Sequence, residues 1–590
     1  MYLVESTEKK NFYNDEDYIN FVVAYDGDIQ KEIDSIKDAS IFFIDDSFAI
    51  VSVRLQNYME TIKNIKSIVY IELNGIYTLS ESPVDDSKAP IFHRNPFLNL
   101  RGSGVVVAII DTGIDYLNNE FMKEDETTRI LRIWDQTIDS GKTPDGFISG
   151  SEYTEEDINK AILAQRQGQN PYDIVPSRDD YGHGTKMAGI VGARGMNREL
   201  IGVAPDCEFI IIKLEEASKE YVDFYYAKGD KPKYRNTDII MALKYLYELS
   251  FTSDKPMIIY LPLGSNLGDH AGASILERYV DNRISSKNSL AVVTSTGNEG
   301  NTDTHTSGKI KSNNESQIIE LNCGKNQQGL VLQIYAQRPS KIKLGIISPS
   351  GEIFENTNPR RTKHILINDS PPWKFIYEGT SVQVTYDSPD EFTGDEKFII
   401  RIDGITEGIW KFILTGNNIV EGRYYAWILQ RELLAEDTKF LRPSPYTTLT
   451  IPGTAKTIIN TSYYNQNNGA TVSESGRGYT AKDYIQPIIT AGGINAITTK
   501  PGGGVITMSG ASVAGAILAG CCALIFQWAV VDENDPQMYA VKLQAYIIRG
   551  ARKRDGDIYP NRQWGYGILD MQEIFNSLMN KWIRSIKYGE

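Results

Sequence analysis

The sequence predicts an α/β protein in which a parallel sheet carries helices on both faces, with a small N-terminal domain and an all-β insertion. Three observations predict this architecture. Apolar, β-branched runs such as VVVAII after Gly104 are typical of strands buried on both faces. Helical segments such as 237–248 alternate with those runs and indicate a parallel sheet. From about 312 to 428, short strands alternate with Gly, Asn and Pro turns, which favours a separate β unit.

The length and charge of the chain narrow its class. A chain of 590 residues exceeds one ordinary hydrophobic core, so several domains are expected. Asp plus Glu number 76 against 61 Lys plus Arg, which gives a net charge of -15. Because nucleic acids and anionic membranes attract basic faces, neither is expected as a partner.

The N-terminal domain has its own pattern. Strand, helix, strand, strand, helix and strand are predicted at 18–25, 29–36, 41–44, 48–55, 58–65 and 68–73, a βαββαβ order of the split ferredoxin-like kind. A polar, Pro-containing stretch follows and is typical of a linker. The expected organisation is therefore a domain at 1–80, a linker at 81–100, an α/β domain at 101–311 and 432–590, and a jelly-roll-like insertion at 312–431.

One segment, 511–531, is apolar and long enough to cross a membrane. A fully buried helix of a large domain has the same composition, and both interpretations stay open from composition alone. Gly515 and Gly520 give the segment a face of small residues, which favours the buried helix.

The N-terminus and the cysteines also exclude some features. No basic start followed by an apolar core marks the N-terminus, so we expect that the chain carries no secretory signal and is made in the cytoplasm. The four cysteines have no metal or disulfide spacing, and no metal or cofactor is expected.

Asp111 stands in VVVAIIDTGID, where a buried strand ends. Chemistry in α/β sheets gathers outside the carboxyl ends of strands, which makes this carboxylate a candidate functional group. A turn-capping role explains the same Asp-Thr-Gly sequence. The motif also resembles half of an aspartic-protease site, but such a site needs two carboxylates, and one motif would require a homodimer.

His183 stands in DDYGHGTKMAG, between two glycines and at the start of a helical segment. The glycines allow the backbone to approach another element closely, which places the imidazole at a helix entrance facing a cleft. Five histidines occur in the chain, and a satisfied core or surface role is the alternative for each.

Ser512 and Asn298 complete the set of candidates. Ser512 follows a Gly-rich stretch and stands at the start of the apolar segment. Helix N–H groups at such a position favour negative charge. The alternative is a serine that only caps the N-terminus of the helix. Asn298, in TSTGNEGN, follows another apolar strand and is placed to donate to a developing oxyanion. A loop asparagine satisfying its own backbone is the alternative.

Together these motifs resemble a known family. The chain order Asp, His, Ser is that of subtilisin and differs from the chymotrypsin and α/β-hydrolase orders. The blocks DTGID, GHGTKMAG, TSTGNEGN and SGASVAGAILAG resemble the Asp, His, oxyanion-Asn and Ser blocks of subtilases, and GVAPDCEFIIIKL and NRQWGYGILD also resemble the family pattern. The resemblance implies a subtilisin-like fold and a serine endopeptidase with Asp111, His183 and Ser512 as catalytic triad and Asn298 in the oxyanion hole.

A finer resemblance is to the clostridial spore-germination subtilases, the Csp family. The insertion between the Asn and Ser blocks, its closing IVEGRYYAWIL and the segment LPLGSNLGDHAGASILERYV carry it. The resemblance implies that Leu263 and Gly264 line the substrate cleft and that the βαββαβ domain is a prodomain. It further implies self-cleavage, retention of the prodomain as chaperone and inhibitor, activation of a cortex-lytic proenzyme, and location in the spore. We expect the cut between Thr78 and Ser82, where the last strand of the prodomain should exit into the active site.

The sequence departs from the family pattern beside the triad. Ala511 replaces a Thr, Ala516 a Pro, Lys186 a His and Pro262 a small polar residue. Some Csp proteins have lost triad residues and act in germinant signalling. An inactive signalling or scaffold protein is therefore the alternative to an active protease, and the intact triad favours the protease.

Overall fold

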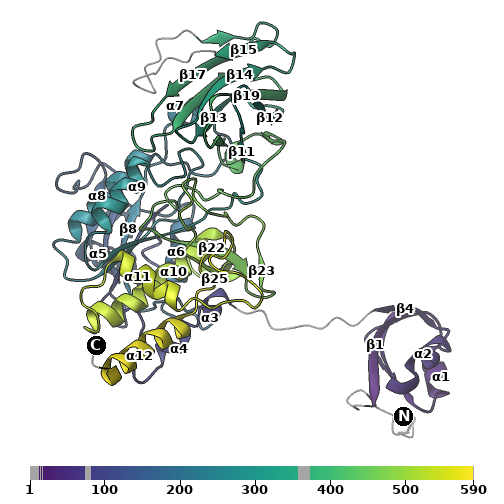
Figure 1. The fold of residues 1–590 in the computed structure, drawn as a ribbon. Coiled ribbons are helices and arrows are strands. Elements are labelled where there is room, and N and C mark those ends of the chain that lie inside the picture. Colours follow the sequence, from purple (N-terminus) through teal and green to yellow (C-terminus); the bar gives the residue numbers. More distant parts are fainter. Residues whose placement is uncertain (1–11, 13–14, 16, 73–81, 357–371, 589–590) are drawn as a thin grey trace. The chain divides into compact units, whose positions relative to one another are not determined.

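The structure, a computed structural model, describes residues 12, 15, 17–72, 82–356 and 372–588. The chain divides into two compact units, Met1–Ser80 and Glu81–Glu590, and each is described by itself (Figure 1).

The first unit is a four-stranded antiparallel sheet with two helices. Its elements are β1 Tyr18–Tyr25, α1 Ile29–Asp34, β2 Ala39–Phe43, β3 Phe48–Arg54, α2 Tyr58–Lys63 and β4 Ile68–Glu72, in the sheet order β2-β3-β1-β4. Alternate residues of β3, such as Val51 and Val53, share one core with Ile33 of α1 and Ile62 of α2. Burial of that one face therefore fixes the register of the strands.

A nine-stranded sheet forms the centre of the second unit. Its strands are β5 Val106–Asp111, β6 Ile130–Asp135, β7 Ser151–Thr154, β8 Glu208–Lys213, β9 Met257–Tyr260, β10 Leu290–Ser295, β22 Ile459–Asn465, β23 Ala470–Thr471 and β24 Ile489–Gly492. The order is β23-β22-β10-β9-β5-β8-β6-β7, with β24 beside β22. All pairings are parallel except those of β7 and β23 at the edges. The predicted α/β sheet is confirmed.

Helices cover both faces of this sheet, because its central strands are apolar on both sides. In β5, Val107 and Ile109 face one core and Ala108 and Ile110 face the other. The first core includes α5 Glu155–Arg166, α6 His183–Gly192, α10 Ala511–Phe526, α11 Ala540–Arg549 and α12 Met571–Tyr588, and the second includes α8 Asn236–Leu249 and α9 Ile275–Tyr279. Helix α10 begins the apolar segment, and 89% of an 18-residue apolar window of this segment is buried inside the structure.

The segment 81–100, expected to be a linker, is instead part of the second unit. Two short helices, α3 Pro83–Asp86 and α4 Pro90–His93, begin at its prolines. Val84, Phe92 and Leu100 are buried in the core of the α/β domain. Its polar, Pro-containing composition is typical of a linker, but the apolar residues spaced along it anchor it to the core of the α/β domain.

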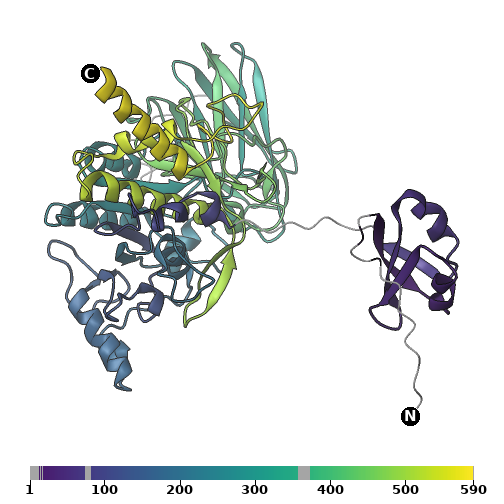
Figure 2. The ribbon, with the colours of Figure 1, turned by 90° about the horizontal axis from the view of Figure 1, so that it is seen from below.

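The insertion is a two-sheet β unit around one core (Figures 1 and 2). Its strands are β11 His305–Lys309, β12 Ser316–Cys323, β13 Gly329–Ala336, β14 Lys341–Ile347, β15 Ile353–Asn356, β16 Trp373–Lys374, β17 Ser381–Asp387, β18 Glu396–Asp403, β19 Gly408–Asn418, β20 Arg423–Trp427 and β21 Lys439–Phe440. The sheets run β11-β20-β13-β18-β17-β16 and β15-β14-β19-β12-β21. The unit starts before residue 312, because β11 pairs with β20.

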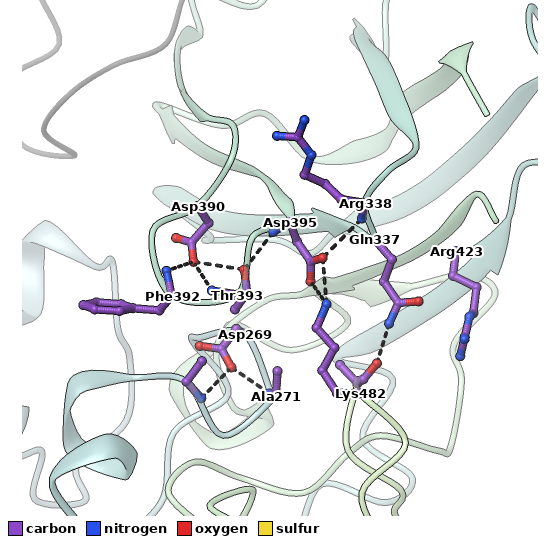
Figure 3. A network of polar contacts seen from close by, with 12 residues as sticks. Asp269, Ala271, Gln337, Arg338, Asp390, Phe392, Thr393, Asp395, Arg423 and Lys482 are labelled. Atoms are coloured by element: carbon purple, nitrogen blue, oxygen red, sulfur yellow. Dashed lines mark hydrogen bonds and ion pairs between the residues drawn. The ribbon is translucent and has the colours of Figure 1, made fainter. Parts of the chain in front are cut away.

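Polar contacts join the insertion to the α/β domain (Figure 3). Lys482 Nζ lies 2.7 Å from both carboxylate oxygens of the buried Asp395. Beside it, the Gln337 side chain donates to the Ala481 carbonyl at 2.6 Å. Because both bonds are largely shielded from water, they orient the insertion on the domain that carries the cleft.

Candidate active site

The carboxyl ends of three adjacent parallel strands, β5, β9 and β10, meet at one edge of the sheet. Strand β5 ends on Asp111, whose side chain is 1% exposed. The chain beyond β9 carries Leu263 and Gly264, and the chain beyond β10 carries Asn298. The predicted site residues of these three segments are therefore brought together by the strand order alone.

Helix α6 delivers His183 to this edge. Gly182 precedes it at φ 80°, a conformation that favours glycine. At Gly184 a Cβ would lie 2.1 Å from the Gly113 carbonyl oxygen, so only glycine lets the helix approach β5 this closely. His183 Nδ1 lies 2.7 Å from Asp111 Oδ2 and 2.9 Å from Oδ1. With an ionised carboxylate, this geometry assigns the proton to Nδ1 and leaves Nε2 as an acceptor.

The charge state of His183 sets the lower pH limit of any reaction in which it acts as a base. Burial opposes the charged imidazole, but the charge and hydrogen bond of Asp111 outweigh burial and raise the pKa of His183 above its usual 6.5. We expect kcat/KM of a reaction that uses His183 as its base to fall about tenfold per pH unit below that raised pKa. In Asp111→Asn the midpoint of the pH profile should move down, and an unchanged midpoint would contradict the pairing.

A second carboxylate, Asp179, holds the segment of Asp111 and the segment of His183 together. Its Oδ1 accepts from the Thr112 hydroxyl at 2.6 Å and from the Gly182 N–H at 2.7 Å. Its Oδ2 accepts from the N–H of Thr185 at 2.8 Å and from the Thr185 hydroxyl at 2.6 Å. Asp179 was not among the predicted site residues, although a carboxylate four residues before the histidine was a usable signal.

Ser512 lies in the first turn of α10. A hairpin of β25 Ala496–Thr499 and β26 Val505–Met508 leads to it, and Gly510 at φ 132° makes the turn into the helix. The hydroxyl of the buried Tyr260, at the end of β9, donates to the Ser512 carbonyl. Ser512, the candidate nucleophile, is thus anchored to a strand of the central sheet.

Asn298 is oriented by the backbone of the same helix. Its Oδ1 accepts from the Ala511 N–H at 3.2 Å. Because the side-chain oxygen of Asn298 is engaged, its NH₂ group is available to donate to another acceptor. The first N–H groups of α10 also have no intrahelical partner and can donate at the same place. This arrangement can stabilise an oxygen that becomes negatively charged.

All six predicted site residues line one cavity of about 620 Å³, namely Asp111, His183, Leu263, Gly264, Asn298 and Ser512. Among the described residues, no hydrogen bond within 3.5 Å joins the His183 and Ser512 side chains. Catalytic hydrogen bonds are often long in ligand-free sites and shorten when substrate binds. The arrangement is suited to nucleophilic attack by Ser512 with His183 as base.

Comparison with known proteins assigns the chain to a protein family. The model of the subtilase family, Peptidase S8, matches residues 102–327 and 440–567. The chain belongs to the subtilase family. Subtilases are serine endopeptidases, and the interval between the matched segments contains most of the β insertion. The predicted family is therefore confirmed.

Three known proteins are similar to this subtilase. The structure of the Clostridium perfringens CspB protease has 30% sequence identity and a TM-score of 0.72, covering 84% of this chain and 99% of that one. The major intracellular serine protease of Bacillus subtilis is 25% identical over 41% of this chain, and the PII-type proteinase of Lacticaseibacillus paracasei is 25% identical over 36%. These alignments span 57% and 10% of the two curated relatives' lengths.

Proposed function

We propose that this subtilase is an active serine endopeptidase with Asp111, His183 and Ser512 as its catalytic triad and Asn298 as oxyanion donor. The observation that carries the proposal is the Asp111–His183 pair beside Ser512 and Asn298 in one cavity. Hydrogen bonding by Asp111 fixes the imidazole tautomer that a general base requires.

The proposed reaction is acyl transfer. His183 Nε2 takes the proton of Ser512 Oγ as that oxygen bonds to the substrate carbonyl carbon, and the Asn298 amide and the Ser512 N–H stabilise the oxyanion. The protonated His183 then gives its proton to the leaving amine as the C–N bond breaks. Water, deprotonated by His183, attacks the acyl-enzyme and releases Ser512 and the second product.

The biological role is a further part of the proposal. The chain cleaves its own N-terminal domain, retains it as chaperone and inhibitor, and activates a spore cortex-lytic proenzyme by limited proteolysis during germination. The similarity to the CspB protease over 99% of that chain supports this role. The expected cut lies between Thr78 and Ser82, of which residues 78–81 fall outside the described part of the chain.

Self-cleavage is tested by the size of the purified protein. Wild type is expected as two pieces, whereas Ser512→Ala should remain one chain of 66.2 kDa. Ser509→Ala is the matched control, since Ser509 also lines the cavity and its hydroxyl accepts from the Asn495 N–H. Two pieces from Ser512→Ala would assign the cut to another protease. One intact wild-type chain that also fails to cleave added protein would favour the signalling or scaffold alternative.

A further inference from the structure

The chain beyond β9 has two backbone edges, and one of them faces the cavity. Residues 261–265 continue β9 without a turn. On one edge, Ser265 exchanges two backbone hydrogen bonds of 2.9 Å with Ile451. Because the backbone groups of successive residues in an extended chain point to opposite edges, Gly264 and Pro262 direct theirs alternately with Ser265, to the other edge. Both residues line the cavity, so this second edge belongs to the candidate active site.

Three polar groups stand on this edge, namely the Pro262 carbonyl and the N–H and carbonyl of Gly264, since proline has no N–H. Gly264 is exposed. Within the described part of the chain, no hydrogen bond reaches the Pro262 carbonyl or the Gly264 N–H. An extended peptide pairs with unsatisfied backbone groups of this kind when it adds a strand to an edge. The backbone of a bound substrate is therefore expected to pair here.

The third group on the edge is already bonded to the β insertion. Gln430, just beyond β20, lines the cavity, and its Nε2 donates to the Gly264 carbonyl at 2.6 Å. The orientation of this amide is fixed, because a carbonyl oxygen can only accept. The segment that carries it is held as well: the Arg431 N–H donates to Glu299 Oε2 at 3.3 Å, and the Leu433 N–H donates to the Gln430 carbonyl at 2.9 Å. Gln430 thus occupies the acceptor that an incoming peptide N–H would use.

Only one end of the Gln430 amide is bonded. Its Oε1 is buried and has no hydrogen-bond partner among the residues that the structure describes. Gln327, in the same insertion, is satisfied at both ends, since its Nε2 donates to the Gly329 carbonyl and its Oε1 accepts from the Ala435 N–H, each at 2.7 Å. A buried acceptor without a partner costs free energy, which weakens the placement of the Gln430 side chain. A peptide N–H that competes for the Gly264 carbonyl can therefore displace it.

We propose that Gln430 of the insertion competes with the substrate backbone for the Gly264 carbonyl and so raises the KM of this subtilase for extended peptides. The proposal rests on the proposed function, because it requires a peptide to bind in the cavity for attack by Ser512. Pairing with this edge is the same before and during the reaction, so the competition affects KM and leaves kcat unchanged. Peptides with a residue that lacks an N–H opposite Gly264, such as proline, escape the competition.

The test uses a phosphonate inactivator built on a short alanine peptide, together with analogues in which an ester oxygen replaces one backbone N–H at a time. Inactivation kinetics give KI, which reports binding, and kinact, which reports the reaction. Gln430→Met keeps the length of the side chain but removes its donor. This variant should lower the KI of the all-amide compound about threefold to tenfold, the value of one hydrogen bond, with kinact unchanged.

The ester analogues identify the group for which Gln430 competes. For the ester at the residue opposite Gly264, KI should be the same in wild type and in Gln430→Met, because this compound has no N–H to gain from the freed carbonyl. Esters at the other positions should show the same fall in KI as the all-amide compound. Gln317→Met, a matched change in the insertion at a side chain that pairs with Glu315, should behave as wild type.

A fluorophosphonate probe that carries no peptide separates failure of this inference from failure of the proposed function. If the probe labels wild type but Gln430→Met leaves every KI unchanged, Gln430 does not compete with substrate. If KI falls equally for all the compounds, Gln430 acts through its bulk and not through the Gly264 carbonyl. Labelling by the probe without any reaction of the peptide compounds would show that the edge accepts no peptide, which also overturns the inference. If wild type is not labelled, the proposed function fails and the inference falls with it.

Discussion

Replacement of His183 by Ala is expected to lower kcat for peptide hydrolysis by about 10⁶-fold, as removal of the triad histidine does in subtilisin. Without an imidazole 2.7 Å from Asp111, the proposed base for the proton of Ser512 is missing. KM should change little, because the side chain acts on the reacting groups. Steady-state kinetics on a peptide substrate measures both constants.

Lys186→Ala, one turn further along α6, is the matched control and should retain near-wild-type kcat. A His183→Ala protein that keeps more than about one-hundredth of wild-type kcat would show that another group acts as the base.

Replacement of Asn298 by Ala should lower kcat by about 10²- to 10³-fold, with little change in KM. The amide of Asn298, held by the Ala511 N–H, would donate to the oxygen only as that oxygen becomes negative. An interaction made in the transition state and not in the ground state affects kcat and leaves substrate binding intact.

Asn298→Asp sharpens this result. The carboxylate keeps an acceptor for the Ala511 N–H but loses the donor and adds a negative charge, so its loss in kcat should be at least as large as that of Asn298→Ala. A variant with unchanged kcat and a raised KM would instead assign Asn298 to ground-state binding.

Two of the residues that depart from the family pattern, Ala511 and Pro262, lie at the site. Ala511 lacks the usual hydroxyl, yet its backbone N–H is the group that orients Asn298. Pro262 lacks an N–H and lines the cavity beside Leu263. Neither change disturbs the hydrogen bonds between Asp111 and His183.

The site could be predicted to the extent that its residues stand in local motifs. Asp111, His183, Asn298 and Ser512 each follow an apolar run or a glycine, and their chain order matches one known arrangement. The role of Tyr260 could not be predicted in this way. Tyr260 lies in MIIYLP, a sequence with no chemical signature, and only the fold places its hydroxyl against the Ser512 carbonyl.

The fold shows the same division between local and tertiary information. The elements of the N-terminal domain were predicted to within a few residues, because period-two and helical patterns are local. The segment 81–100 was misjudged, since its turn-forming composition hid three apolar residues whose burial depends on the rest of the domain. The start of the insertion was placed too late, because β11 is defined by its pairing with β20, a partner more than a hundred residues away.

Labelling of the purified protein by a fluorophosphonate probe tests the central claim most directly. The account predicts covalent labelling of wild type at Ser512, loss of labelling in Ser512→Ala, and retained labelling in the cavity-lining control Ser509→Ala. Labelling that persists in Ser512→Ala, or its absence from folded wild-type protein freed of its N-terminal domain, would contradict an activated nucleophile at this position.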